Sequence, residues 1–502
     1  MSDETLGYKE TTTKDLSKFF KLERTIHDLS SKPVIGIGIA AIFLSIIWLA
    51  THTLTAGVEN QAIIVAAGVI GGYMALNIGA NDVANNVGPA FGAKSLTMLG
   101  ALVIAAIFET AGAVLAGGDV VRTISKNIID PGMIPDTRVF LWLMLSSLLA
   151  AALWINFATY VGAPVSTTHS IVGGVMGAGI AATGFSVVNW VVMSKIAASW
   201  IISPFLGGII AAMFLAFIKK RVLYQEDTIA AAKKWVPILV SLMAGVFAAY
   251  LSVKGLKKVW KPEPWMVAAI GFGFLAGTYW VVNPLIKRRA EGMENTKKAI
   301  RSLFHLPLIC AAALLSFAHG ANDVANAVGP LAAIVNSAST GAVATGTVEI
   351  PTWVLFVGGA GFTMGLMLFG PKLIRTVGNK ITRMNPMRAY CVALSAAITV
   401  IVASALGLPV SSTHIAIGAV FGVGFLREYH TARGVHIGNG SAKKKSRPPS
   451  KWDLLPAEEK SRRKKLVRRQ YLWTILAAWL ITVPLSAVFA AGIFYAFQAF
   501  LG

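Results

Sequence analysis

Long apolar segments recur along the chain and constrain its fold more than any other feature. With 55% hydrophobic and 14% charged residues, the composition is more apolar than that of soluble globular proteins. Since a transmembrane helix needs about 20 mostly apolar residues, the sequence predicts an all-α polytopic membrane protein with about 12–13 transmembrane segments. The candidate segments lie near residues 34–52, 61–78, 96–117, 139–160, 164–185, 194–218, 235–253, 265–286, 302–320, 353–370, 389–407, 409–426 and 471–500.

Prolines stand between these segments or at their first residue, at Pro89, Pro164, Pro330 and Pro409. A proline inside a helix removes a backbone hydrogen bond and kinks or ends the helix. We therefore expect some segments to be broken or re-entrant instead of complete crossings.

The basic residues indicate the orientation, because cytoplasmic loops carry an excess of Lys and Arg. If residues 1–33 form a cytoplasmic N-terminal segment, most of the 45 Lys and Arg residues fall on the inner side. The net charge of +22 is then a topology signal and does not indicate nucleic-acid binding. The basic stretch 427–470 is predicted to be a cytoplasmic loop, either solvated or in contact with anionic lipid.

Other classes have little support in the sequence. The two cysteines, Cys310 and Cys391, both lie in apolar stretches, so no disulfide framework is expected. No spacing among the eight histidines resembles a zinc site. Residues 1–33 are polar and mixed in charge, so we expect no cleaved signal peptide, and this favours a bacterial inner membrane.

An internal duplication is the most informative pattern. Residues 79–89 read GANDVANNVGP and residues 320–330 read GANDVANAVGP, so ten of eleven positions are identical. Further on, PVSTTH at 164–169 matches PVSSTH at 409–414. The wider spacing between Trp200 and Trp479 identifies the basic stretch as an insertion in the second copy.

The duplication predicts a domain plan of two inverted repeats. Each copy holds five apolar segments with a pair between them, so the copies face opposite sides of the membrane, as in many secondary transporters. Broken helices in matching positions of such repeats indicate the binding site. We expect a cytoplasmic segment 1–33, an extra helix 34–60, a first repeat 61–218, a linking region 219–301 with a helix pair, and a second repeat 302–502 carrying the insertion 427–470.

The repeated motifs carry the chemistry. Asp82 and Asp323 lie within apolar runs, where a charge persists only beside a cavity, a partner or an ion. Carboxylate and amide oxygens suit hard cations, and amide NH2 groups can donate to phosphate oxygens. The prolines before the hydroxyl clusters favour helix N-termini, which are anion sites. The amide and hydroxyl groups are Asn81, Asn85, Asn322, Asn326, Ser166, Thr167, Thr168, Ser411, Ser412 and Thr413.

Packing is the alternative interpretation of these motifs, because small residues bring membrane helices together. Glu109, inside an apolar segment, is predicted to be a coupling-ion ligand or a cavity charge. His169 and His414 are expected to cap helices or to hydrogen-bond to ligating side chains, in preference to relaying protons. His319 is equally compatible with helix hydrogen bonding or function.

On these residues the sequence resembles the inorganic phosphate transporter (PiT) family, through GANDVANNVGPA at 79–90, GANDVANAVGPL at 320–331, PVSTTH and PVSSTH. The resemblance implies a phosphate–cation symporter that works by alternating access and forms a homodimer in the lipid bilayer, with no cofactor besides co-transported sodium. It implies a phosphate site of Asp82, Asn85, Ser166, Thr167, Asp323, Asn326, Ser411 and Ser412. It also implies sodium sites close to Asn81, Thr168, Asn322 and Thr413. From their charge, Asp82, Asp323 and Glu109 are expected to hold the cation there.

Alternatives stay open at this point. A proton-coupled branch of the family carries His at the positions of Asn81 and Asn322, so the two Asn residues favour sodium. Proton-coupled uptake of a metal–phosphate complex or of sulfate is the second transport hypothesis. An intramembrane hydrolase using Ser166 or Ser411 with His169 or His414, and a passive anion channel, are hypotheses from other classes.

Overall fold

The computed structural model describes residues 33–161, 165–255, 261–343, 350–376, 384–432 and 470–501. Apart from one isolated bridge between Ile129 and Val188, the regular structure of this part of the chain is helical. Eleven helices in it are long and apolar enough to cross a membrane. The prediction of an all-α, multi-pass membrane protein is therefore confirmed. The predicted segment 1–33, except Pro33, and residues 433–469 of the basic stretch lie outside the described residues.

Each of the predicted regions from residue 34 onward contains helices. The extra N-terminal helix is α2 (Pro33–Leu54), and the linking region holds α10 (Thr228–Lys254), α11 (Pro264–Arg289) and the short α12 (Lys297–Leu303). The first repeat contains α3 (Gln61–Asn81), α4 (Val83–Gly92), α5 (Met98–Ala116), α6 (Gly118–Arg122), the π-helical turn η1 (Thr123–Asn127), α7 (Thr137–Val161), α8 (Thr167–Thr183) and α9 (Trp190–Ile218). The second repeat contains α13 (His305–Thr340), α14 (Thr352–Thr376), α15 (Pro386–Ala405), α16 (Ser412–Ala432) and α18 (Gln470–Leu501).

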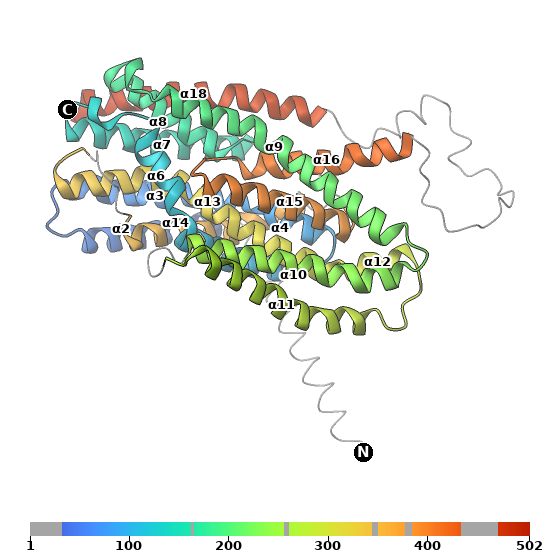
Figure 1. Ribbon diagram of the computed structural model, residues 1–502. Coiled ribbons are helices and arrows are strands. Elements are labelled where there is room, and N and C mark those ends of the chain that lie inside the picture. The colour runs from blue at the N-terminus through green and yellow to red at the C-terminus, as the bar shows by residue number, and fades with distance from the viewer. Residues whose placement is uncertain are drawn as a thin grey trace.

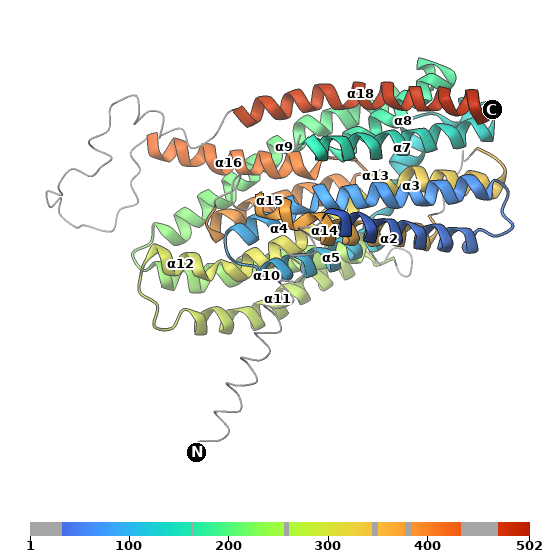
Figure 2. The ribbon, with the colours of Figure 1, turned by 180° about the vertical axis from the view of Figure 1, so that it is seen from behind.

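The two repeats interlock. Helix α3 packs on α14 while α13 packs on α5, and α8 packs on α18 while α9 packs on α16. Each of these helices thus has a close neighbour in the other copy. Figures 1 and 2 show α3, α13, α14 and α15 in the middle of the bundle, with α7, α8 and α18 along one side and α10 and α11 along the other.

Glycines permit this close packing in matching pairs. A Cβ atom on Gly320 would strike the backbone carbonyl of Glu109, and one on Gly79 would strike that of Phe362. Small residues let membrane helices approach to backbone contact. The matching contacts also show that Glu109 on α5 and Phe362 on α14 occupy equivalent positions in the two copies.

Two of the thirteen predicted segments, 164–185 and 409–426, are not among the eleven spans. Helix α8 has only 17 residues, and α16 carries Ser, Thr, His, Arg and Glu residues among its 21. Helix α8 forms a hairpin with α7, and α16 forms one with α15. Both begin beside the aspartate motifs in the interior of the bundle, where Thr167 contacts Asp82 and Ser412 contacts Asp323, so these hairpins are re-entrant.

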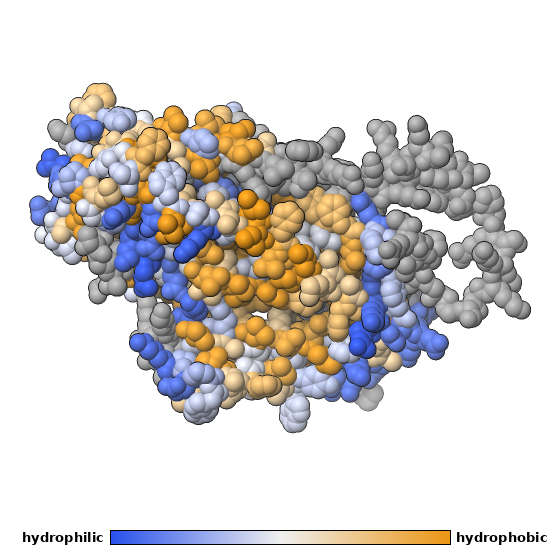
Figure 3. All heavy atoms as spheres, turned by 45° about the horizontal axis from the view of Figure 1, so that its top comes forward, coloured by the Kyte–Doolittle hydropathy of each residue, from blue (hydrophilic) through white to orange (hydrophobic). Residues whose placement is uncertain are grey.

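The surface agrees with insertion in a bilayer. Figure 3 shows a broad apolar area across the middle of one face, with hydrophilic residues gathered toward its two sides. Large apolar side chains such as Phe205, Phe272 and Trp280 are mostly exposed. Helix α13, in contrast, is buried along most of its length.

Candidate functional site

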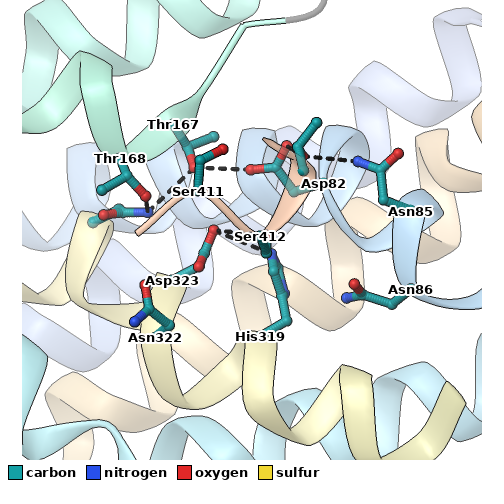
Figure 4. Close-up of polar contacts among 12 residues, drawn as sticks. Asp82, Asn85, Asn86, Thr167, Thr168, His319, Asn322, Asp323, Ser411 and Ser412 are labelled. Atoms are coloured by element: carbon teal, nitrogen blue, oxygen red, sulfur yellow. Dashed lines mark hydrogen bonds and ion pairs between the residues drawn. The ribbon is translucent and has the colours of Figure 1, made fainter. Parts of the chain in front are cut away.

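The repeated motifs of both copies meet in the interior of the bundle. Asp82 lies at the junction between α3 and α4, and Asp323 lies inside the continuous helix α13. Both side chains are buried, with about 1–2% exposure. In Figure 4 they lie beside the first turns of α8 and α16. The broken helix of the first copy and the unbroken helix of the second therefore deliver equivalent carboxylates to one place.

The first group of residues, the Asp82 half-site, consists of Asp82, Asn85, Thr167 and Thr413. The hydroxyl of Thr167 donates to one carboxylate oxygen of Asp82 at 2.8 Å. The hydroxyl of Thr413 donates to the other at 3.2 Å, and itself accepts from the amide of Asn85 at 2.9 Å. Because Thr413 belongs to the second copy, the half-site is complete only when both repeats are assembled.

The second group, the Asp323 half-site, consists of Asp323, Ser412, His319 and Glu109. The hydroxyl of Ser412 lies 3.5 Å from Oδ2 of Asp323, and Nε2 of His319 lies 3.2 Å from the same oxygen. The other ring nitrogen of His319 lies 2.6 Å from Oε2 of Glu109. Glu109 also accepts a hydrogen bond from the amide of Asn86 at 2.7 Å. His319 therefore bridges two buried carboxylates.

The two half-sites together can hold a cation. One ligand atom each from Asp82, His319 and Asp323 lies within 4.8 Å of the others. In the part of the chain that the structure describes, Oδ1 of Asp323 and Oδ1 of Asn326 are buried without a hydrogen-bond partner. Buried polar atoms are nearly always satisfied, so these two oxygens indicate a place for a ligand. Carboxylate and amide oxygens suit a hard cation.

The amide of Asn326 ties the hydroxyl cluster of the first copy to α13. Its Nδ2 donates to the hydroxyls of Thr167 and Thr168, each at 3.2 Å. This matches the bond of Asn85 to Thr413, since each amide contacts the hydroxyl cluster of the opposite copy. Together these side chains form a polar ring around the carboxylates.

Ser166 and Ser411 cap the helices that follow them. Ser166 accepts from the backbone N–H of His169 at 3.3 Å, and Ser411 accepts from that of His414 at 3.4 Å. The ring of His169 also bonds to the Ser166 hydroxyl at 2.7 Å and stacks on Trp200. The cap is therefore the Ser166 hydroxyl, and the His169 ring contacts this hydroxyl without capping the helix itself. The first turns of α8 and α16 present N–H groups, as helix N-termini do at anion sites.

Two predicted sodium ligands, Asn81 and Asn322, make their hydrogen bonds to the hairpins and not to the two carboxylates. The amide of Asn81 donates to Thr159 on α7 at 2.9 Å. The amide of Asn322 donates to Ser404 on α15 at 2.9 Å, and its oxygen accepts from the N–H of Val410 at 3.2 Å. Each Asn therefore fixes the re-entrant hairpin of its own copy.

Glu109 is buried as expected, but its contacts are to Asn86 and His319. It reaches Asp323 only through the histidine ring. Asn86 was not singled out by the sequence, although it is the one position at which the two eleven-residue motifs differ, Ala327 being its counterpart. That mismatch was the available signal for Asn86. Thr159 and Ser404 had no comparable signal.

Helical repeats that meet around buried carboxylates, with re-entrant hairpins beside them, are typical of membrane transporters. Residues 78–490 match the sequence model of the phosphate transporter family, PHO4. The chain therefore belongs to the phosphate transporter family, a family of transporters and not of enzymes, so the hydrolase hypothesis is wrong.

Similar proteins agree with this assignment. A Helicobacter pylori (strain J99) protein named "Putative phosphate permease" is 45% identical, with 93% of this chain and 95% of that protein covered. A Pyrococcus furiosus relative, also named as a phosphate permease, is 36% identical over 86% of this chain and 96% of its own. A solved structure described as "The sodium-dependent phosphate transporter" matches with a TM-score of 0.77 and 36% identity, covering 88% of this chain and all of that one.

Proposed function

We propose that the protein is a secondary active symporter that imports inorganic phosphate together with sodium ions by alternating access. The observation that carries the proposal is the pair of buried carboxylates, Asp82 and Asp323, among amide and hydroxyl groups from both repeats. The similar solved structure is that of a sodium-dependent phosphate transporter, and this supports the choice of cation.

Electrostatics gives the order of binding. A phosphate dianion will not enter beside two buried carboxylates, because like charges at short range repel strongly where water is excluded. Sodium would therefore bind first, at Asp82 and Asp323, and phosphate would follow. This obligatory order couples the two fluxes, since phosphate cannot bind to the unloaded site.

Each side chain has a proposed role. Phosphate would lie against the first turns of α8 and α16, whose N–H and hydroxyl groups donate to its oxygens. The proposed phosphate ligands are Asn85, Ser166, Thr167, Asn326, Ser411 and Ser412, with Asp82 and Asp323 beside them. Sodium would be held by the two carboxylates with Asn81, Thr168, Asn322 and Thr413 close by, while Glu109 acts through His319.

Alternating access would arise from the two hairpins. The α7–α8 hairpin belongs to one copy and the α15–α16 hairpin to the other, and both carry site residues at their tips. Rocking of one repeat against the other would expose these tips to opposite sides in turn. We further propose a homodimer in a bacterial inner membrane, with the N-terminus in the cytoplasm.

The test is uptake of labelled phosphate into proteoliposomes that have an inward sodium gradient and no pH gradient. We expect phosphate to accumulate above its outside concentration, and this accumulation to vanish when choline replaces sodium. Uptake that requires an inward proton gradient would instead support the proton-coupled hypothesis. Uptake that only equilibrates phosphate would indicate a passive channel, and sulfate uptake without phosphate uptake would change the substrate.

A further inference from the structure

The tip of the α15–α16 hairpin, residues 405–411, is held by side chains from five other elements. The tip ends at Ser411 and is followed by Ser412, and both serines belong to the proposed phosphate site. Its carbonyl groups accept from Lys254 on α10, Thr123 on η1, Asn322 on α13, Trp200 on α9 and Thr168 on α8, at 2.7–3.1 Å.

Two of these contacts come from outside the site. Nζ of Lys254 donates to the carbonyl of Ala405 at 3.1 Å and lies 2.5 Å from a carboxylate oxygen of Asp119 on α6. The hydroxyl of Thr123 donates to the carbonyl of Gly407 at 2.7 Å. Lys254 and Asp119 are mostly buried, with 19% and 23% of their side chains exposed. The ion pair is therefore better shielded than a surface pair.

The chemistry suits the end of a helix. The last carbonyls of α15 have no partner within the helix, and its C-terminus carries a partial negative charge. The ammonium of Lys254 neutralises that end and is itself neutralised by Asp119. Gly407, at φ +68°, turns the chain so closely past Thr123 that a Cβ atom there would lie 3.3 Å from the Thr123 hydroxyl.

The position of these residues matters for access. Lys254 ends α10, which lies in the linking region outside both repeats, while Asp119 and Thr123 lie in the connection between α5 and α7. In the orientation that the basic residues predict, both places face the outer side. The contacts thus join the second-copy hairpin to the outer end of the first copy.

We propose that Lys254, together with Asp119 and Thr123, is an outer latch that positions the α15–α16 hairpin tip. The latch holds the tip while the outer side of the site is closed, and its contacts break when the site opens outward. Lys254 is a positioning residue and does not contact phosphate. The inference rests on the proposed function, because it assigns to the linking helix pair a control of access to that same site.

The test compares uptake kinetics of Lys254→Met with wild type. Without the latch the outward-open state is more populated, so the KM for external phosphate falls, since apparent affinity scales with the competent fraction. Reclosing becomes slower, so kcat falls as well. We expect each to fall at least roughly tenfold, the change that one lost hydrogen bond to a charged group brings to an equilibrium.

Further variants separate a latch from general damage. Asp119→Asn should shift both constants in the same direction by less, because it leaves the bond of Lys254 to Ala405 in place, and the double variant should match Lys254→Met. Thr123→Val should shift KM in the same direction by less, and Lys254→Arg should stay close to wild type. Lys195→Met, an exposed lysine of α9, is the matched control and should change neither constant.

An unchanged KM in Lys254→Met, or additive effects of the two charge variants, would overturn the latch. A second measurement does not depend on transport. A Lys254→Cys, Asp119→Cys protein should be cross-linked by a short bis-methanethiosulfonate reagent, which spans the side-chain length that the cysteines lack, and should then fail to admit external phosphate until the cross-link is reduced. If wild type itself takes up no phosphate, the proposed function fails, and the latch is judged by whether sodium lowers cross-linking, as opening requires. No effect of sodium would overturn it.

Discussion

The two half-sites share an ancestry in the duplicated sequence but differ in what surrounds the carboxylate. Within the described part of the chain, the Asp82 carboxylate accepts hydrogen bonds from two hydroxyl groups, those of Thr167 and Thr413. Asp323 has a more distant hydroxyl and the ring of His319, which also contacts Glu109. The carboxylates are equivalent by position, yet one has neutral partners while the other belongs to an ionisable chain.

Departures from the duplication produce this difference. The matching backbone contacts make Phe362 the counterpart of Glu109 in the other copy. The sequence repeat makes Ile78 the counterpart of His319. The counterpart of Asn86, the amide that donates to Glu109, is Ala327. The polar residues Glu109, His319 and Asn86 thus each have an apolar residue at the equivalent position of the other copy. A symmetric scaffold supplies the site, and three substitutions make its halves unequal.

The largest expected effect is the loss of either carboxylate. Asp82→Asn and Asp323→Asn should each reduce sodium-driven phosphate uptake at least roughly 100-fold, because each removes the buried charge that attracts the cation. Uptake into proteoliposomes measures this. As a control for folding, each variant should be extracted from the membrane in detergent and elute as a single monodisperse peak in size-exclusion chromatography. Wild-type uptake in both variants would contradict the proposed function. Loss in only one would show which half-site binds the coupling ion.

Much of this site could be predicted from sequence, because its motifs are local. The eleven-residue repeat and the proline–hydroxyl motif indicated Asp82, Asp323 and the hydroxyl clusters, and hydropathy indicated the spans. The pairing of Glu109 with His319 could not be predicted, since it joins residues 210 positions apart. It depends on α5 packing against a helix of the opposite copy, which no local pattern specifies.

The course of the two hairpins is a second feature that the sequence alone could not predict. The segments beginning at Pro164 and Pro409 have nearly the apolar length of a span, so length alone did not separate them from crossings. Their re-entrant course depends on tertiary contacts such as the bond of Asn322 to Ser404. Asn322 was predicted as a sodium neighbour because of its oxygen chemistry, but its contacts show that it also fixes a hairpin.

The next largest expected effect is a loss of stability when the contact between Glu109 and His319 is broken. His319→Ile leaves Glu109 buried without its ring partner, and Glu109→Phe leaves His319 without its shorter contact. Breaking one side of a buried ion pair costs about 3–5 kcal/mol. The double variant restores the residue types of the first-copy position Ile78 and the second-copy position Phe362, and should recover most of that loss. Thermal unfolding in detergent measures all three proteins.

If the losses of unfolding free energy in His319→Ile and Glu109→Phe add up in the double variant, the two side chains do not interact. The proposed difference between the two half-sites would then be wrong. Phe362→Leu is a suitable control, because it changes the apolar counterpart of Glu109 without adding charge. It should cost only about 1–2 kcal/mol, because it removes a small part of a buried apolar side chain.

The smallest effect separates the two hydroxyl contacts. Thr167→Val keeps the shape of the side chain but removes the 2.8 Å bond to Asp82 and the acceptor for Asn326. Ser412→Ala removes a contact of only 3.5 Å to Asp323, which His319 also contacts. We expect Thr167→Val to raise the sodium concentration for half-maximal uptake about tenfold, and Ser412→Ala to raise it about twofold.

This difference follows from the partners of each carboxylate. When Thr167 is lost, Asp82 keeps only the hydroxyl of Thr413, whereas Asp323 without Ser412 still has a ring nitrogen at 3.2 Å. Thr167→Ser retains the hydroxyl and should leave sodium dependence unchanged, which separates hydrogen bonding from packing. Equal shifts in Thr167→Val and Ser412→Ala would mean that the histidine does not compensate, and the two half-sites would then be functionally alike despite their different surroundings.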